Sequence, residues 1–442
     1  MTSRLTRLLK ARHTVLKPTS RSLVSTASSS SLLLARDWIS ESLYNLEHGY
    51  FNTAASPVGQ LPDSLPFQQL AGQQAYLQTL RLWYDKLQVS WLTPAEIFQP
   101  FYGHAVAAAL LEKLPQKQPL DIIEVGGGSG RLARDVLDYL HDHHQEQYAR
   151  ASYTSLEISP KLAEVQRQKV LHDGKHRSCY KVAQHDASTP VAWGAVNEQP
   201  CVIILMEVLD NLPHDRVWRQ SSEADWQETW IQSSGPRHDR MQHKHVEVTE
   251  PVADPLVWAC LEAAQLQPGH VSQSWLHATL DWILGQVSPS GSGSGQTMWL
   301  PTSCLQLLQR ICAARPNHVI IAADFDKLPD VTVPGQGAPL VASTINGQTL
   351  DHPSYLVPQG TADIFFPTDF QLLQSLHQLA NQGRGGIQGQ VMKTKAFMKQ
   401  HADLAKPECR VMLPAVMGSL GIRAASAKDS LFNKQVAIDC QG

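Results

Sequence analysis

Four glycines and a serine, Gly126-Gly127-Gly128-Ser129-Gly130, follow a short apolar run and precede an amphipathic segment. Glycine has no Cβ, so the backbone can turn sharply here and approach a ligand closely. A helix that starts after such a turn presents unpaired N–H groups and the positive end of its dipole. That combination suits a carboxylate as well as a phosphate. Gly126, Gly128 and Gly130 are therefore candidates for binding a cofactor.

The glycine spacing separates two classes of cofactor. Gly-x-Gly-x-Gly differs from the Gly-x-Gly-x-x-Gly of dinucleotide-binding proteins. The loop also begins at residue 126, behind a helical portion, instead of near the start of the chain. Both features favour S-adenosylmethionine over a nicotinamide cofactor. A plain connection from strand to helix is the alternative for the loop taken alone.

Acidic residues stand at or just after the ends of three successive expected strands, at Glu124, Glu157 and Asp186. Glu124 can accept a hydrogen bond from the amino group of a cofactor. Glu157 ends the strand that follows the glycine loop and its helix. A carboxylate at that place can accept hydrogen bonds from both ribose hydroxyls. Asp186 can hold an adenine amino group, with His185 beside the ring. These positions predict an adenosine-containing ligand.

The fourth expected strand runs directly into Met206-Glu207-Val208-Leu209-Asp210-Asn211-Leu212-Pro213. Ligands of open α/β sheets lie beyond the carboxyl ends of the strands, so this segment should reach the methyl donor. Methyl transfer from a sulfonium depends mainly on alignment and desolvation of the acceptor. A guanidinium acceptor needs carboxylates to orient it. Glu207 and Asp210 are the catalytic candidates, and Met206 is a further cofactor-binding candidate; a loop in which Asp210 merely caps a turn is the alternative.

Strands that alternate with helices position these residues. Leu120–Val125, Tyr153–Glu157, Tyr180–Ala183 and Cys201–Met206 are expected strands, and helices are expected to begin near Gly130 and Pro160. This alternation predicts a parallel sheet with helices on its faces. Later expected elements are a helix at 302–315, a strand at His318–Asp324, a strand pair at 339–344 and 361–366, and a helix capped by Thr368.

The predicted class is α/β, a Rossmann-like methyltransferase sheet with a helical N-terminal portion and a helical or irregular insertion. The boundaries that we expect are, in chain order, a transit peptide at 1–36, a helical portion at 37–116, the cofactor-binding core at 117–214, an insertion or substrate lobe at 215–300 that covers the site and contains a flexible linker at 288–295, and the remaining core with the C-terminal segment at 301–442.

Composition narrows the functional classes. Hydrophobic residues make up 43% of the 442 residues and charged residues 17%, which is enough for a sizeable core. The net charge of −3 argues against a DNA-binding protein but leaves RNA as a possible substrate. The seven cysteines form no Cys-x-x-Cys pair, and no Cys/His group has the spacing of a zinc site, so we expect free thiols and no metal. No apolar run is long enough for a membrane span.

The first 36 residues differ in kind from the rest. They contain no acidic residue, many Ser and Thr, and basic residues interleaved with leucines at helical spacing. This composition is typical of a mitochondrial transit peptide, with a disordered basic tail as the alternative.

The glycine loop, the Glu207-to-Pro213 motif and the segment from Gly360-Thr361-Ala362-Asp363 to Phe370 occur together in this order, and they resemble the MidA-like methyltransferases. The resemblance covers roughly residues 90 to 400. It implies S-adenosylmethionine as cofactor, symmetric dimethylation of a protein arginine, a respiratory complex I subunit as substrate, and the mitochondrial matrix. It assigns Glu157 to the ribose and places Glu207 and Asp210 beside the substrate.

This chain departs from the family pattern at Met206, where Asn or His is usual, and at Val208-Leu209, where an aromatic pair is common. Gly337-Ala338-Pro339-Leu340 also stands where a Gly-Thr-Leu-Arg stretch is expected. These departures weaken the expectation for the methyl acceptor more than the expectation for the cofactor. Methylation of a small molecule or RNA, and an assembly chaperone without turnover, are therefore the alternative functions.

Overall fold

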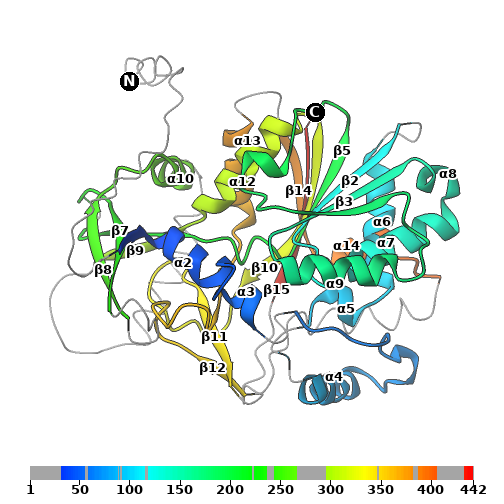
Figure 1. Ribbon diagram of the computed structural model, residues 1–442, viewed down its shortest axis with the longest axis horizontal. Coiled ribbons are helices and arrows are strands. Elements are labelled where there is room, and N and C mark those ends of the chain that lie inside the picture. The colour runs from blue at the N-terminus through cyan, green and yellow to red at the C-terminus, as the bar shows by residue number, and fades with distance from the viewer. Residues whose placement is uncertain are drawn as a thin grey trace.

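The computed structural model describes residues 31–54, 58–87, 89, 92–114, 118–221, 223–235, 243–265, 295–345, 348–381, 387–405 and 433–441. Within these ranges the largest sheet has seven strands in the order β14-β15-β10-β5-β2-β3-β4 (Figure 1). Its strands are β2 (Leu120–Val125), β3 (Ala151–Glu157), β4 (Tyr180–Gln184), β5 (Cys201–Met206), β10 (His318–Lys327), β14 (Ile387–Lys393) and β15 (Asn433–Gln441).

The middle of this sheet is parallel, and its strand order reverses between β2 and β5. β3 and β4 continue on one side of β2, while β10 continues on the far side of β5. β15 runs antiparallel to both of its neighbours, β10 and β14. Such a reversal leaves a crevice at the carboxyl ends of the two central strands, where open α/β sheets bind ligands. The predicted α/β sheet is confirmed.

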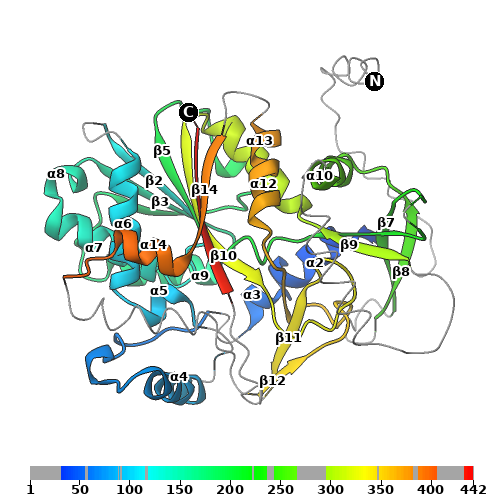
Figure 2. The ribbon, with the colours of Figure 1, turned by 180° about the vertical axis from the view of Figure 1, so that it is seen from behind.

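Side chains that alternate along the strands supply two cores. Ile122, Val202 and Ile204 face one layer of helices, and Ile123, Ile203 and Leu205 face the other. The first layer comprises α4 (Gln73–Leu87), α5 (Pro94–Ile97), α6 (Phe101–Lys113), α7 (Arg131–His143), α9 (Pro160–Leu171) and α14 (Thr394–His401). The second comprises α10 (Pro255–Gln265), α12 (Thr302–Ala314) and α13 (Phe370–Ala380) (Figure 2). Short α8 (Gln145–Tyr148) follows α7.

The segment 215–300 differs from the expectation of a helical or irregular insertion. Its described part is mostly an antiparallel sheet of β6 (Asp215–Arg219), β7 (Gln227–Ser234), β8 (Lys244–Pro251) and β9 (Gln296–Leu300), joined at its edge by β1 (Ser31–Leu34). These strands are rich in polar residues, so their alternation is a weak signal in the sequence. The linker expected at 288–295 lies outside the described residues except for its last residue.

The expected N-terminal helical portion is divided among different parts of the fold. α2 (Ala35–Tyr44) and α3 (Tyr50–Thr53) pack with the antiparallel sheet, whereas α5 and α6 belong to the core of the large sheet. Residues 31–36, which the sequence analysis assigned to a transit peptide, form β1 and the start of α2. Residues 1–30 of that peptide lie outside the described residues, so the transit peptide stays a prediction.

A small third sheet of β11 (Leu340–Ile345), β12 (Gln348–Asp351) and β13 (Asp363–Phe365) completes the described sheets and contains the expected strand pair. The helix that follows is capped by Asp369 and not by Thr368, because the Asp369 carboxylate accepts hydrogen bonds from the N–H groups of Gln371 and Leu372. In the described part of the chain, no helix combines the length and the apolar character that crossing a membrane requires.

Candidate functional site

The glycine loop takes a conformation that other residues rarely adopt. Gly126, Gly128 and Gly130 have φ angles of +66°, +52° and +78°. A Cβ at Gly126 would lie 2.9 Å from a methyl carbon of Val208, and a Cβ at Gly130 would lie 3.0 Å from the Cα of Gln166. The loop therefore requires glycine both for its backbone angles and for its close neighbours.

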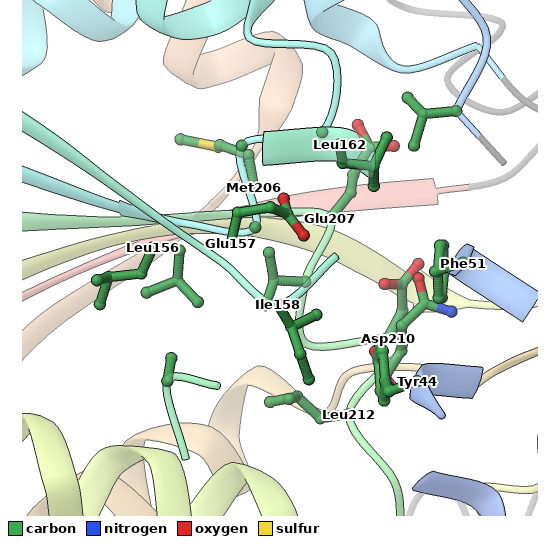
Figure 3. A pocket seen from close by; sticks show the side chains of 18 of the residues that line it. Tyr44, Phe51, Leu156, Glu157, Ile158, Leu162, Met206, Glu207, Asp210 and Leu212 are labelled. Carbon is green, nitrogen blue, oxygen red and sulfur yellow. The ribbon is translucent and has the colours of Figure 1, made fainter. Parts of the chain in front are cut away.

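A cavity of about 450 Å³ lies at this loop, within the size range of small-molecule sites. The ends of β2, β3 and β5 line it on one side and α2 and α3 on the other (Figure 3). None of the described residues between 215 and 300 lines the cavity. The antiparallel sheet instead supports α2, which lines the cavity with Arg36, Asp37, Ser40 and Tyr44.

Glu124 lies beneath the glycine loop, with its side chain 3% exposed. Its Oε2 accepts hydrogen bonds from the hydroxyls of Tyr153 and Ser155, each at 3.1 Å. Burial raises the pKa of Glu124 to about 7, against the opposing effect of these two hydrogen bonds. A Cβ on Gly127 would come within 2.9 Å of that same oxygen. Glu124 thus holds the underside of the loop while remaining part of the cavity wall.

Glu157 joins the end of β3 to the glycine loop. Its Oε1 accepts a hydrogen bond from the Ser159 N–H at 2.9 Å, and its Oε2 accepts one from the Gln166 side-chain amide at 2.8 Å. The same amide also donates to the carbonyl of Gly128 at 3.2 Å. Burial raises the pKa of Glu157 to about 7. The carboxylate is therefore fixed in orientation at the position where the sequence predicted a ribose contact.

Asp186 also lines the cavity, as its place after β4 predicted. Its Oδ1 accepts a hydrogen bond from the Ser188 N–H at 2.8 Å, which closes a local turn. His185 is exposed beside it and donates its backbone N–H to the Glu157 carbonyl at 3.0 Å. Met206 lies at the end of β5, and its sulfur accepts a hydrogen bond from the hydroxyl of Tyr102 at 3.7 Å.

Glu207 adopts φ +55°, a left-handed conformation that is uncommon for a residue with a side chain. Its N–H donates to the Ala323 carbonyl at 2.9 Å, so the turn is fixed to β10. Residues held in such conformations cluster at functional sites. The turn ends β5 at Met206 and directs the following loop along the cavity, where Glu207 and Asp210 both lie (Figure 3).

Asp324, a fully buried residue of β10, holds the Asp210 loop. Its Oδ2 accepts hydrogen bonds from the backbone N–H groups of Leu209 at 2.9 Å and Asp210 at 3.1 Å. Sequence reasoning treated Asp324 only as the end of a strand. The available signal was an acidic residue closing an apolar run, the same signal that identified Glu124 and Glu157. Gln166 was also missed, because a single glutamine on a helix has no distinguishing pattern.

The loop after β5 and the Thr361-Ala362-Asp363 segment lie together, although about 150 residues separate them. The Asn211 side-chain amide donates to Asp363 Oδ1 at 3.0 Å, and the Phe366 N–H donates to the Asp210 carbonyl at 2.7 Å. The hydroxyl of Tyr44 donates to the Asn211 carbonyl at 2.8 Å. Helix α2, the loop and β13 therefore meet at one corner of the cavity.

The charge of the cavity favours a cationic ligand. Among the described residues that line it, carboxylates outnumber guanidinium groups: Asp37, Glu124, Glu157, Asp186, Glu207, Asp210 and Asp363 against Arg36 and Arg131. Both arginines already pair with other carboxylates, at Asp215, Asp254 and Asp135. Burial raises the pKa of Tyr44 well above its ordinary value, and the surrounding carboxylates raise it further. This wall suits a sulfonium or a guanidinium and disfavours a phosphate.

Comparison with known proteins agrees with this geometry. A family described as putative S-adenosyl-L-methionine-dependent methyltransferase matches residues 105–385. A Schizosaccharomyces pombe protein named protein arginine methyltransferase NDUFAF7 homolog, mitochondrial, is 25% identical over 289 residues. That match spans 61% of this chain and 57% of the relative, so the chain matches little more than half of the relative's length.

A solved structure from Burkholderia thailandensis, a candidate methyl transferase bound to S-adenosyl-homocysteine, has the same fold. The TM-score is 0.55 at 16% identity, covering 92% of this chain and 87% of that one. The family match confirms both the predicted resemblance and the predicted cofactor, S-adenosylmethionine.

Proposed function

The chain belongs to this family of S-adenosyl-L-methionine-dependent methyltransferases, and on that premise we propose that it methylates an arginine side chain of a protein substrate. The observation that carries the proposal is the pair Glu207 and Asp210, two carboxylates on one turn beside the glycine loop. A guanidinium keeps its positive charge at neutral pH, so an acceptor site for arginine needs carboxylates placed in advance.

The residues present fit the cofactor. Gly126, Gly127 and Gly128 line the cavity without side chains of their own, and the ribose contact that we propose for Glu157 is supported by its fixed carboxylate. The first turn of α7 offers its N–H groups to the carboxylate of the methionine moiety. When bound, S-adenosylmethionine supplies a methyl carbon already activated by its sulfonium. The protein therefore has to bind, align and desolvate the acceptor.

Glu207 and Asp210 have complementary tasks in this proposal. Asp210 is 5% exposed and its backbone is held by Asp324, so it can orient a guanidinium without moving. Glu207 is less buried and leads directly from β5. The attacking nitrogen would form a bond to the methyl carbon as the carbon–sulfur bond breaks and its electron pair passes to sulfur. The nitrogen then loses one proton, and we assign Glu207 as the acceptor of that proton. Tyr44 and Phe51, whose rings stack at 5.5 Å, form the apolar side of the acceptor channel.

The finer parts of the proposal are symmetric dimethylation, a complex I subunit as the substrate, and the mitochondrial matrix. They rest on the resemblance of the motifs and on the name of the Schizosaccharomyces pombe relative, which includes both arginine methylation and mitochondria. The basic, acid-free composition of residues 1–36 supports the location independently. Mass spectrometry of mitochondrial proteins from cells lacking the gene tests them together: a dimethylarginine should disappear.

The central experiment compares Glu207→Gln and Asp210→Asn with Glu262→Gln, an exposed residue of α10 outside the cavity. We expect both site variants to bind S-adenosylhomocysteine as the wild type does and to lose at least about 100-fold in methyl transfer, the usual range for removed proton-transfer or charge-stabilising groups. Calorimetry and incorporation of labelled methyl groups are the measurements. Unchanged transfer in both variants would contradict the assignment. Tight cofactor binding with no labelled protein in the wild type would favour the assembly chaperone, and labelled RNA or metabolites would favour the other alternative.

A further inference from the structure

Three buried side chains meet on the second helix layer, away from the cavity. Cys312 comes from α12, His318 from the first residue of β10 and His377 from α13, and their exposed fractions are 4%, 1% and 0%. One ligand atom from each lies within 4.8 Å of the other two. α12 and α13 pack side by side here (Figure 2).

The hydrogen bonds of His318 fix which of its nitrogens carries the lone pair. Its Nδ1 lies 2.5 Å from the Arg315 carbonyl oxygen, which can only accept, so Nδ1 carries the hydrogen. In the neutral ring the lone pair is then on Nε2, which accepts a hydrogen bond from Nε2 of His377 at 2.8 Å, and a metal ion would take the place of this hydrogen. A histidine whose other nitrogen donates to a backbone carbonyl is the usual arrangement of a metal ligand, because the second bond sets the tautomer and the ring orientation.

We propose that Cys312, His318 and His377 bind a thiophilic metal ion, Cu(I) or Zn(II), between α12, β10 and α13. Thiolate and imidazole are the ligands that these two ions prefer. Binding releases the Cys312 thiol proton, and the thiolate offsets part of the metal charge. With Cu(I) the site becomes neutral, which a buried position favours. Three ligands complete a trigonal Cu(I) site, whereas Zn(II) usually takes a fourth ligand.

The site is separate from the methyltransferase chemistry. None of the three side chains lines the cavity: Cys312 follows the lining residue Leu307 by about 7.5 Å along α12, and His318 begins β10 at the end of the strand away from the cavity. The ion would instead cross-link two helices to the first residue of a central strand. A metal whose site does not exist in the unfolded chain contributes its binding free energy to folding. We therefore expect the ion to raise the melting temperature without changing the chemistry of methyl transfer.

The test of the proposed metal site uses the whole chain and two metal ions. Purified chain is loaded with Zn(II), or with Cu(I) under reducing conditions and in competition with a chromophoric Cu(I) chelator, and bound metal is counted by plasma mass spectrometry. We expect one equivalent of one ion and a rise of several degrees in melting temperature on loading. Co(II) loading should give the thiolate-to-cobalt absorption band, which reports a Cys ligand directly.

Cys312→Ser and His377→Gln should each lose the bound equivalent and the absorption band. Cys260→Ser, a buried cysteine of α10 outside the cluster, should keep both. Circular dichroism of each variant checks folding. If a site variant does not fold, the wild-type cobalt spectrum still decides: no thiolate band together with no retained Zn(II) or Cu(I) overturns the proposal. Equal metal content in Cys312→Ser and Cys260→Ser overturns it as well. Neither result bears on methyl transfer.

Discussion

At the residue scale, the raised pKa of Glu124 sets a pH dependence of stability. Burial raises its pKa from 4.5 to about 7, so the folded protein binds more protons than the unfolded chain between these values. The free energy of unfolding should therefore fall as pH rises through this window. Glu124→Gln removes the titrating group, so across this window the free energy of unfolding of the variant should fall by up to about 3 kcal/mol less than that of the wild type. Urea denaturation from pH 5 to 8 measures it; identical slopes for variant and wild type would contradict the prediction.

Glu157 gives the opposite pH dependence for binding. Its ionised form is the better acceptor for ribose hydroxyls, and its pKa is raised to about 7 by burial. Affinity for S-adenosylhomocysteine should weaken several-fold from pH 8 to pH 6, and Glu157→Ala should weaken it at least about tenfold at pH 8. Calorimetry measures both, with exposed Glu164→Gln on α9 as the control. Retained affinity in Glu157→Ala would remove Glu157 from the cofactor site.

The sequence predicts where these carboxylates stand but not how they are held. Glu157 was identified because it ends a strand, a property of the local pattern. Its partner Gln166 depends on how α9 packs against the glycine loop, which no local pattern contains. The cluster of Cys312, His318 and His377 shows the same limit: the expectation of no metal site considered spacing along the chain, whereas the ligands that we propose come from separate elements.

At the scale of elements, replacing Asp324 should disturb the loop after β5 more than it disturbs β10, the strand that contains Asp324. Asp324 accepts hydrogen bonds from the N–H groups of both Leu209 and Asp210. In Asp324→Asn one of the two carboxylate oxygens becomes an NH2 group, which cannot accept these hydrogen bonds. We expect a loss of about 1–3 kcal/mol in the free energy of unfolding. The rate of methyl transfer should fall by more than the increased fraction of unfolded protein accounts for, while the affinity for the cofactor is retained. Asp330→Asn, an exposed residue that tolerates this change in its left-handed conformation, is the control.

Five of the seven strands of the large sheet were predicted, and the clearest of them, β2, β5 and β10, are apolar runs buried on both faces. β14 and β15 were not predicted. β2 and β5 begin and end at the residues that the sequence analysis gave. The antiparallel sheet was missed because its strands have one partly exposed face, and its pairing is long-range: Leu33 of β1 faces Ile231 of β7. A pairing across nearly 200 residues is decided by packing of the whole fold and not by local preference.

At the scale of the whole molecule, Arg36 connects the antiparallel sheet to the second helix layer. Its guanidinium contacts Asp215 of β6 at 2.6 Å and Asp254, which precedes α10, at 2.6 Å. Arg36→Met leaves Asp215, 1% exposed, without its cation and should cost about 3–5 kcal/mol. Adding Asp215→Asn should restore part of the loss. Thermal unfolding of the two single variants and the double variant measures the coupling, and strictly additive losses would contradict it.

β15 has a consequence for synthesis of the chain. It is the last described strand in sequence, yet it lies between β10 and β14 and pairs with both. Until the ribosome has released residues 433–441, β10 and β14 each present an unpaired backbone edge, the kind of surface that recruits other chains. The nascent protein therefore cannot close its main sheet until residues 433–441 have emerged. Its dependence on chaperones should be greatest in the interval between the emergence of β14 and that of β15.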